Sequence, residues 1–311
     1  MDWNQLMIIT TAPDNVPIVI MLFLMPFYTW YGLKQSFAND RLIEKLEADP
    51  ELAKTHHRKT QPWVKGWDST VHVWPYLLKI EFLAAIIVTL ILVVWSIFLD
   101  APLEEPANPN LTMNPSKAPW YFLGLQEMLV YFDPWIAGVV LPGIILGGLM
   151  AIPYIDVNPR GNGYYTYKQR KFSIWMFFIG FLVLWLVLIV VGTFIRGPGW
   201  MWFWPGETWD HHRIVHELNR NLHEFFGIKD SEVLKAAGFG ATVVGAYFAV
   251  GGFACDRLFR KFAPEMVKKQ NVAQYATTIA LTVMMFGLPI KMLLRLGFTV
   301  KYVMVTPWFN I

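Results

Sequence analysis

The residues with the clearest chemical potential lie in residues 114–127, which read NPSKAPWYFLGLQE. A plain connector needs only turn formers and polar residues, whereas this stretch combines prolines, adjacent aromatic residues and a Gln-Glu pair between two strongly apolar segments. Its prolines stiffen an extended backbone and suppress helix before Trp120, and from Trp120 to Phe132 only Gly124 disfavours a helix. A rigid loop followed by a short apolar helix predicts a pocket wall at a membrane edge, suited to a ligand with a flat polar head and an apolar tail.

The composition predicts the surroundings of this wall. The chain has 311 residues, of which 55% are hydrophobic and only 16% are charged, as is typical of a polytopic membrane protein. The net charge of +3 is spread out, which argues against nucleic-acid binding. A single cysteine, Cys255, excludes an internal disulfide and a cysteine-ligated metal cluster within this chain.

We therefore predict an all-α integral membrane protein with about six transmembrane helices. Each span needs about 20 mostly apolar residues. The qualifying segments are 16–33, 77–99, 134–154, 172–195, 236–256 and 273–292. The N-terminal run lacks a basic region before it, so we expect a retained span and not a cleaved signal.

The loop charges predict the orientation. Lys and Arg cluster in residues 34–76, 155–171 and 257–272, which should face the cytoplasm, whereas residues 100–133 contain only Lys117. We therefore expect a multi-pass protein of the bacterial inner (cytoplasmic) membrane. Loop 100–133 would lie on its positive, periplasmic side, together with both termini and residues 196–235.

Two segments outside the spans have the pattern of surface helices. The sequence NDRLIEKLEADPELAKTHH predicts a charged cytoplasmic helix broken at Pro50. The sequence HHRIVHELNRNLHEFFGI places Ile214, Leu218, Leu222 and Phe225 on one face of a helix.

The histidines and the charged residues of the spans offer weaker candidates. No predicted span contains a histidine, so we expect no b-type haem to be bound by this chain alone. His212, His216 and His223 have the spacing of a metal site on a helix, but they alternate with charged residues, so we favour a solvated face and predict no metal. Glu81 could belong to a proton path, or pair with a neighbouring subunit.

Several motifs, in order and at the right spacing, resemble the C-terminal half of cytochrome b, and more narrowly the separate subunit IV of split b6f-type complexes. The resemblance covers about residues 70–200. It is carried by VWPYLLKIEF, FLDAPLEEPANP, APWYFLGL and LPGIILGGLMAIPYIDVNP, together with the apolar run 172–195. In that family the loop corresponding to 100–133 lines a quinol-oxidising pocket on the positive side of the membrane.

The resemblance implies the site residues, with two departures. The family's Pro-Glu-Trp-Tyr motif becomes Ala118-Pro119-Trp120-Tyr121, so Pro119 replaces the glutamate credited with taking a quinol proton, and Gln126 stands where a polar aromatic residue is expected. The quinol-binding residues would then be Ala118, Pro119, Trp120, Tyr121, Phe122, Leu123 and Gln126.

Another group must accept the proton. Glu127 would share a helix face with Trp120, and partial burial would favour its neutral form, so we expect it to act with Tyr121, which could hydrogen-bond the quinol oxygen. The alternative for Glu127 is a surface acid paired with a partner subunit. Glu81, Glu104 and Glu105 could extend a proton path, with Asp133 as a further candidate.

The resemblance implies a membrane subunit of a bc-type quinol-oxidising complex, which is not an enzyme on its own. A separate haem-bearing cytochrome b subunit would share the quinol site, a Rieske iron–sulfur protein and/or a c-type cytochrome would take electrons, and the complex would be dimeric. The alternative is a non-catalytic anchor whose pocket holds lipid or structural quinone. The expected parts are 1–70 (extra span and surface helix), 71–200 (core), 201–235 (external segment) and 236–311 (extra spans).

Overall fold

The computed structural model describes residues 3–55, 73–100, 103, 106–157, 164–213 and 218–311. Within these residues all long elements are helices, and β-structure is limited to isolated bridges. Six helical segments are long and apolar enough to cross a membrane, so the prediction of an all-α membrane protein with six spans is confirmed. They are Val16–Ala48, Val73–Phe98, Ile136–Ile155, Tyr167–Ile195, Val233–Phe262 and Val272–Phe298.

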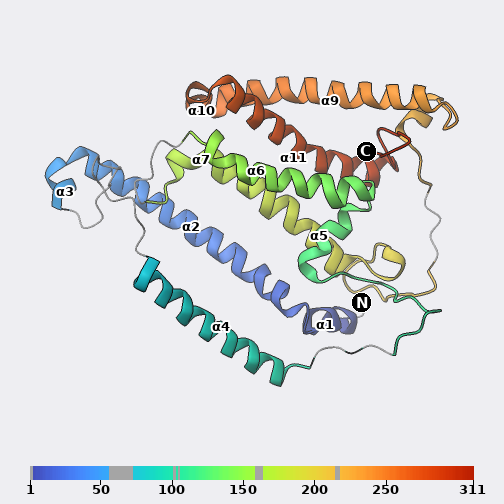
Figure 1. Cartoon of the computed structure of the whole chain (residues 1–311), viewed down its shortest axis with the longest axis horizontal. Helices are drawn as coiled ribbons and strands as arrows, with labels where there is room; N and C mark the ends of the chain where they lie inside the picture. The colour runs from blue at the N-terminus through green and yellow to red at the C-terminus, as the bar shows by residue number, and fades with distance from the viewer. Residues whose placement is uncertain (1–2, 56–72, 101–102, 104–105, 158–163, 214–217) are drawn as a thin grey trace. The chain divides into compact units, whose positions relative to one another are not determined.

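The chain divides into two compact units (Figure 1). The first comprises residues 1–113 with 159–170, and the second comprises residues 114–158 with 171–311. The four-part division expected from the sequence stays a prediction.

The first unit contains α1 (Trp3–Thr11), α2 (Val16–Ala48), α3 (Pro50–Thr55) and α4 (Leu78–Phe98). The expected break before Pro50 is present: Asp49 has an extended conformation, and its carboxylate accepts hydrogen bonds from the backbone N–H groups of Glu51 and Leu52. The expected boundary between a span ending at residue 33 and a separate charged helix was wrong. Nothing in residues 34–48 interrupts the backbone ladder, so α2 continues unbroken to Ala48.

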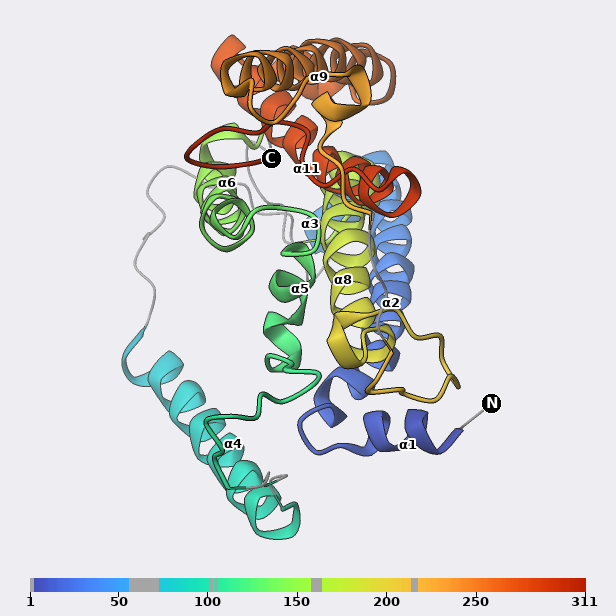
Figure 2. The ribbon, with the colours of Figure 1, turned by 90° about the vertical axis from the view of Figure 1, so that its right-hand side faces the viewer.

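The second unit holds the elements around the proposed pocket wall: α5 (Trp120–Met128), α6 (Leu141–Ile155), α8 (Leu186–Val190) and the π-helical turn η4 (Val191–Ile195). Helix α5 packs along α8 and η4 (Figure 2). Gly124 permits this contact, because a Cβ atom there would lie only 3.3 Å from Ile189 Cγ1.

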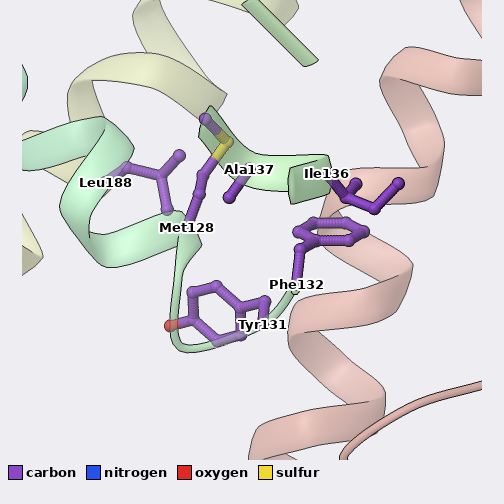
Figure 3. Packing of buried hydrophobic residues seen from close by; sticks show 6 residues of the cluster. All are labelled: Met128, Tyr131, Phe132, Ile136, Ala137 and Leu188. Atoms are coloured by element: carbon purple, nitrogen blue, oxygen red, sulfur yellow. The ribbon is translucent and has the colours of Figure 1, made fainter. Parts of the chain in front are cut away.

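A buried apolar cluster anchors the turn that follows α5 (Figure 3). Phe309 and Ile311, at the end of the chain, pack against this cluster. Its buried members are Met128, Tyr131, Phe132, Ile136, Ala137 and Leu188.

The two remaining long helices of this unit, α9 (Val233–Phe262) and α11 (Val272–Phe298), pack together and are joined through α10 (Pro264–Lys269) (Figure 1). The segment that follows α11 pairs with the segment that precedes α9. The backbone N–H of Leu222 donates to the carbonyl of Tyr302, and the backbone N–H of Lys301 donates to the carbonyl of Arg220.

The predicted surface helix over residues 211–228 was wrong in its described part. Only Leu222–Phe226 forms a short 3-10 helix, and it ends at Gly227, whose φ is 79°. The physical reason is competition for backbone hydrogen bonds, because Arg220 and Leu222 use theirs to pair with the C-terminal segment instead of continuing a helix. Ile214 lies outside the described residues.

Candidate functional site

Helix α5 begins where the sequence predicts, directly after Pro119, and it has two distinct sides. Leu123, Gly124 and Glu127 are buried against the rest of the unit. On the other side, Tyr121 and Phe122 each keep about half of their surface exposed, at 51% and 52%. Their rings lie 4.8 Å apart, and Tyr121 also meets Trp120 edge to face. Helix α5 therefore presents an aromatic surface, hereafter the aromatic wall (Trp120, Tyr121 and Phe122).

Behind this wall, Glu127 is fully buried in a network of charged hydrogen bonds. Arg196 Nε and Nη2 donate to its carboxylate at 2.9 Å and 2.7 Å. The Tyr131 hydroxyl donates to Oε1 at 2.7 Å, and the indole Nε1 of Trp200 donates to Oε2 at 3.1 Å. Arg196, Tyr131 and Trp200 thus supply hydrogen-bond donors to both oxygens of this buried carboxylate. The expectation that Glu127 is half-buried was wrong, since its side chain has no exposed surface.

The backbone around Trp200 is shaped to complete this network. Trp200 has a φ of 56°, which is uncommon for a residue other than glycine. Its carbonyl accepts a hydrogen bond from Arg196 Nη1 at 3.0 Å while its indole reaches Glu127. The burial of Tyr131, and next the charge of Glu127, raise the pKa of the Tyr131 hydroxyl. Tyr131 thus stays a neutral hydrogen-bond donor.

Lys117 lies beside the same network. Its Nζ donates to the carbonyl of Thr193 at 2.9 Å and lies 5.0 Å from the centroid of the Trp209 ring. Burial lowers the pKa of Lys117 to about 8, and the negative charge of Glu127 opposes this shift. An amine with this pKa is partly neutral near physiological pH, so it can take up a proton.

Gln126 fastens the loop to the helix. Its Oε1 accepts from the backbone N–H of Ala118, and its Nε2 donates to the carbonyl of Ser116, both at 2.8 Å. Both polar ends of the side chain are therefore engaged by the loop that contains Pro119.

We expect Gln126→Leu to release this loop. Two hydrogen bonds are lost, each worth about 1 kcal/mol, so amide exchange at residues 116–118 should become about fivefold faster or more. Hydrogen exchange read by mass spectrometry measures this, with Gln126→Glu as the control, since it keeps an acceptor for Ala118. Equal amide exchange rates in the wild type and Gln126→Leu would show that the two hydrogen bonds of Gln126 do not hold the loop.

The remaining predicted site residues have varied positions. Ala118 is partly buried, Pro119 is exposed and Leu123 is buried on the packed side of α5. Glu81 is exposed on α4 in the first unit, and Glu104 and Glu105 lie outside the described residues. The roles predicted for all these residues stay predictions.

The solvated face expected for the histidines of residues 211–228 was wrong for His223. In the described part of this segment only Leu222–Phe226 is helical, His212 is exposed and His216 lies outside the described residues. His223 is buried, with Nε2 2.9 Å from a carboxylate oxygen of Asp230. Together with Glu224, these side chains offer ligand atoms within 4.8 Å of one another, a weak indication of a cation site.

The sequence analysis missed Arg196 and Lys117. A signal was present for Arg196, which is the only charged residue in residues 172–206, as Glu127 is in residues 118–132. Two isolated opposite charges, at the ends of segments expected on the same side of a membrane, predict a pair. No comparable signal marked the burial of Lys117.

Comparison with known proteins supports the resemblance over this region. The family model described as Cytochrome b(C-terminal)/b6/petD matches residues 106–199, which include the loop, α5, α6 and the span that ends before Arg196. The predicted resemblance to the C-terminal half of cytochrome b is thus confirmed for this segment.

Two curated proteins that share one name are similar to part of this chain. The menaquinol:cytochrome c reductase cytochrome c subunit of Geobacillus thermodenitrificans is 31% identical over a segment covering 28% of this chain and 37% of that protein. The protein of that name from Bacillus subtilis is 30% identical, over 27% of this chain and 34% of the relative. The chain thus spans only about a third of the length of each. No solved structure gives a significant match.

Proposed function

We propose that this chain is a membrane subunit of a quinol-oxidising electron-transfer complex, in which the loop before α5 and the aromatic wall form one side of the quinol site. The family match over residues 106–199 and the names of the relatives support this assignment. One observation carries it: the aromatic side of α5 faces outwards, while the buried network of Glu127 and Arg196 fixes the opposite side of the same helix.

The chain would share this site with partner subunits. A haem-bearing cytochrome b subunit would supply the histidine ligands, because none of the described spans of this chain contains a histidine. One electron of the quinol would pass to a Rieske iron–sulfur protein and/or a c-type cytochrome, and the other to the b haems. We place the complex in the bacterial inner membrane as a dimer, with loop 100–133 and proton release on the periplasmic side.

The relevant experiment replaces the aromatic wall in the assembled complex. Tyr121→Ala and Phe122→Ala each remove apolar contact worth about 1.5–3 kcal/mol, so we expect KM for quinol to rise about tenfold or more. Steady-state quinol oxidation by the purified complex measures this. Tyr154→Ala is the matched control, because that ring is 77% exposed at the far end of α6. If Tyr121→Ala and Phe122→Ala have the same KM for quinol as Tyr154→Ala, the assignment is refuted.

The second candidate is a non-catalytic anchor whose pocket holds lipid or structural quinone. Two observations favour it: Pro119 cannot take a proton, and both polar ends of Gln126 are engaged by the loop. An anchor would keep wild-type quinol oxidation in both Tyr121→Phe and Glu127→Gln. Loss of turnover in either variant, in a fully assembled complex, would exclude it.

A further inference from the structure

A tight turn before α9 brings a buried histidine and an aspartate together. The short helix η6 (Leu222–Phe226) ends at Gly227, whose φ of 79° lies in the left-handed region that glycine adopts readily, and the chain turns back there. Asp230, three residues further on, thereby returns to η6. One oxygen of its carboxylate lies 2.9 Å from His223 Nε2.

His223 has one ring nitrogen engaged and one without a partner. Its side chain is only 1% exposed, and Nε2 contacts Asp230. The other nitrogen, Nδ1, is buried and has no hydrogen-bond partner among the described residues. Buried polar atoms are normally satisfied, so this ring indicates that a group from outside the chain, a water or an ion, belongs beside it.

Carboxylate oxygens gather at the same place. Glu224 uses Oε1 to accept from the backbone N–H of Asn221 at 2.7 Å, and Asp230 uses Oδ1 towards His223, so each carboxylate keeps a second oxygen. One ligand atom from each of His223, Glu224 and Asp230 lies within 4.8 Å of the other two. Ligands bound to zinc at about 2.0–2.2 Å lie about 3–3.5 Å apart, so small side-chain rotations would complete such a set.

The local charges favour a cation. Within the part of the chain that the structure describes, neither Glu224 nor Asp230 forms a salt bridge with a lysine or an arginine. The Asn221 side chain adds a further acceptor, because its Nδ2 lies 3.5 Å from Asp230 Oδ1 and its own Oδ1 is buried without a partner in the described residues. A cation here would meet two carboxylates and an amide oxygen, with no positive side chain competing for them.

We propose that His223, Glu224 and Asp230 bind a divalent metal ion of the zinc class, with the Asn221 side-chain oxygen or water completing its coordination. The imidazole nitrogen favours zinc and its first-row neighbours over magnesium and calcium, which prefer oxygen ligands. The ion fastens η6 to the turn that leads into α9, where the C-terminal segment pairs with the chain. None of these residues belongs to the aromatic wall, so the inference is independent of the proposed function.

The test measures binding of Zn²⁺ to the purified full chain in detergent or nanodiscs by titration calorimetry. Asp230→Asn keeps an oxygen acceptor for His223, and Glu224→Gln keeps a capping acceptor for the Asn221 N–H, so each removes a charged ligand and preserves the local hydrogen bonds. We expect one ion per wild-type chain, and an affinity about 100-fold lower in each variant. Zinc should also raise the thermal midpoint of the wild type more than that of either variant.

The controls separate this site from other zinc-binding groups. His212 is exposed in the same external segment and lies outside the cluster, so His212→Asn should bind zinc as tightly as the wild type. Absence of zinc binding by the wild type, wild-type affinity in either carboxylate variant, or an equal loss in His212→Asn would each overturn the proposal. A turn held by hydrogen bonds alone predicts no difference between the wild type and Asp230→Asn in their response to zinc.

Discussion

Arg196→Met should destabilise the chain by about 3–5 kcal/mol, because it leaves the Glu127 carboxylate buried without its counter-charge. The two side chains are 6% and 0% exposed, and Arg196 makes the 2.7 Å contact that links the 196–203 segment to α5. The large cost arises from the uncompensated charge that remains, and not from the net value of the pair. Thermal unfolding of the purified chain in detergent or lipid nanodiscs measures the change.

A double variant and an exposed pair provide the controls. Glu127→Gln with Arg196→Met removes both charges, so it should recover most of the stability lost in Arg196→Met alone. Arg213 forms a similar contact with Glu207, at 2.7 Å, but those side chains are 40% and 37% exposed. Arg213→Met should therefore have little effect on the midpoint temperature of thermal unfolding. If Arg196→Met and Arg213→Met have equal effects, the buried pair is not a stabilising contact.

The pairing of Glu127 with Arg196 was not predicted from the sequence, because it depends on tertiary packing. Glu127 and Arg196 are 69 residues apart, and their contact depends on how closely α5 packs on α8. Isolated charges in apolar stretches indicate that partners exist, but they do not indicate which ones. The role predicted for Glu127 therefore came from its place in the loop, and the isolated charge of Arg196 was not connected with it.

The spans and the start of α5 were predictable for a local reason. A helix needs about 20 apolar residues to cross a bilayer, and these residues are consecutive in the sequence. The prolines before Trp120 likewise act on their immediate neighbours, so the helix begins directly after Pro119 as expected. The end of α5 was not predictable in this way, because the helix stops at Met128, where the turn enters the apolar cluster around Tyr131.

The surface helix predicted over residues 211–228 was wrong because its backbone partners lie far away in the sequence. Residues 211–228 have a convincing helical pattern, but the backbone groups of Arg220 and Leu222 pair with the chain beyond α11. A pattern of apolar side chains says nothing about a competing backbone partner about 80 residues away. Residues 299–302 thus determine the fold of this segment, and Phe309 and Ile311 support the apolar cluster at the turn after α5.

Gly240→Ala tests that support with a single methyl group. A Cβ at Gly240, on α9, would lie 2.6 Å from Met304 Cα and 2.7 Å from its Cβ, so the backbone of the C-terminal segment would have to move. Met304 is paired with Ile311, whose backbone N–H donates to its carbonyl at 2.9 Å. We expect a loss of about 1–3 kcal/mol from overpacking, with faster amide exchange in residues 299–311 and in the turn after α5.

The matched control lies on the same helix. A Cβ at Gly238 would meet no atom within 4 Å, so Gly238→Ala should leave the stability unchanged or raise it by about 0.5–1 kcal/mol through helix propensity. The two substitutions differ only in position, and only Gly240→Ala should lower the thermal midpoint. If Gly240→Ala raises the midpoint as Gly238→Ala does, the C-terminal segment is not docked on α9. The apolar cluster at the turn after α5 would then have to form without support from a C-terminal segment docked on α9.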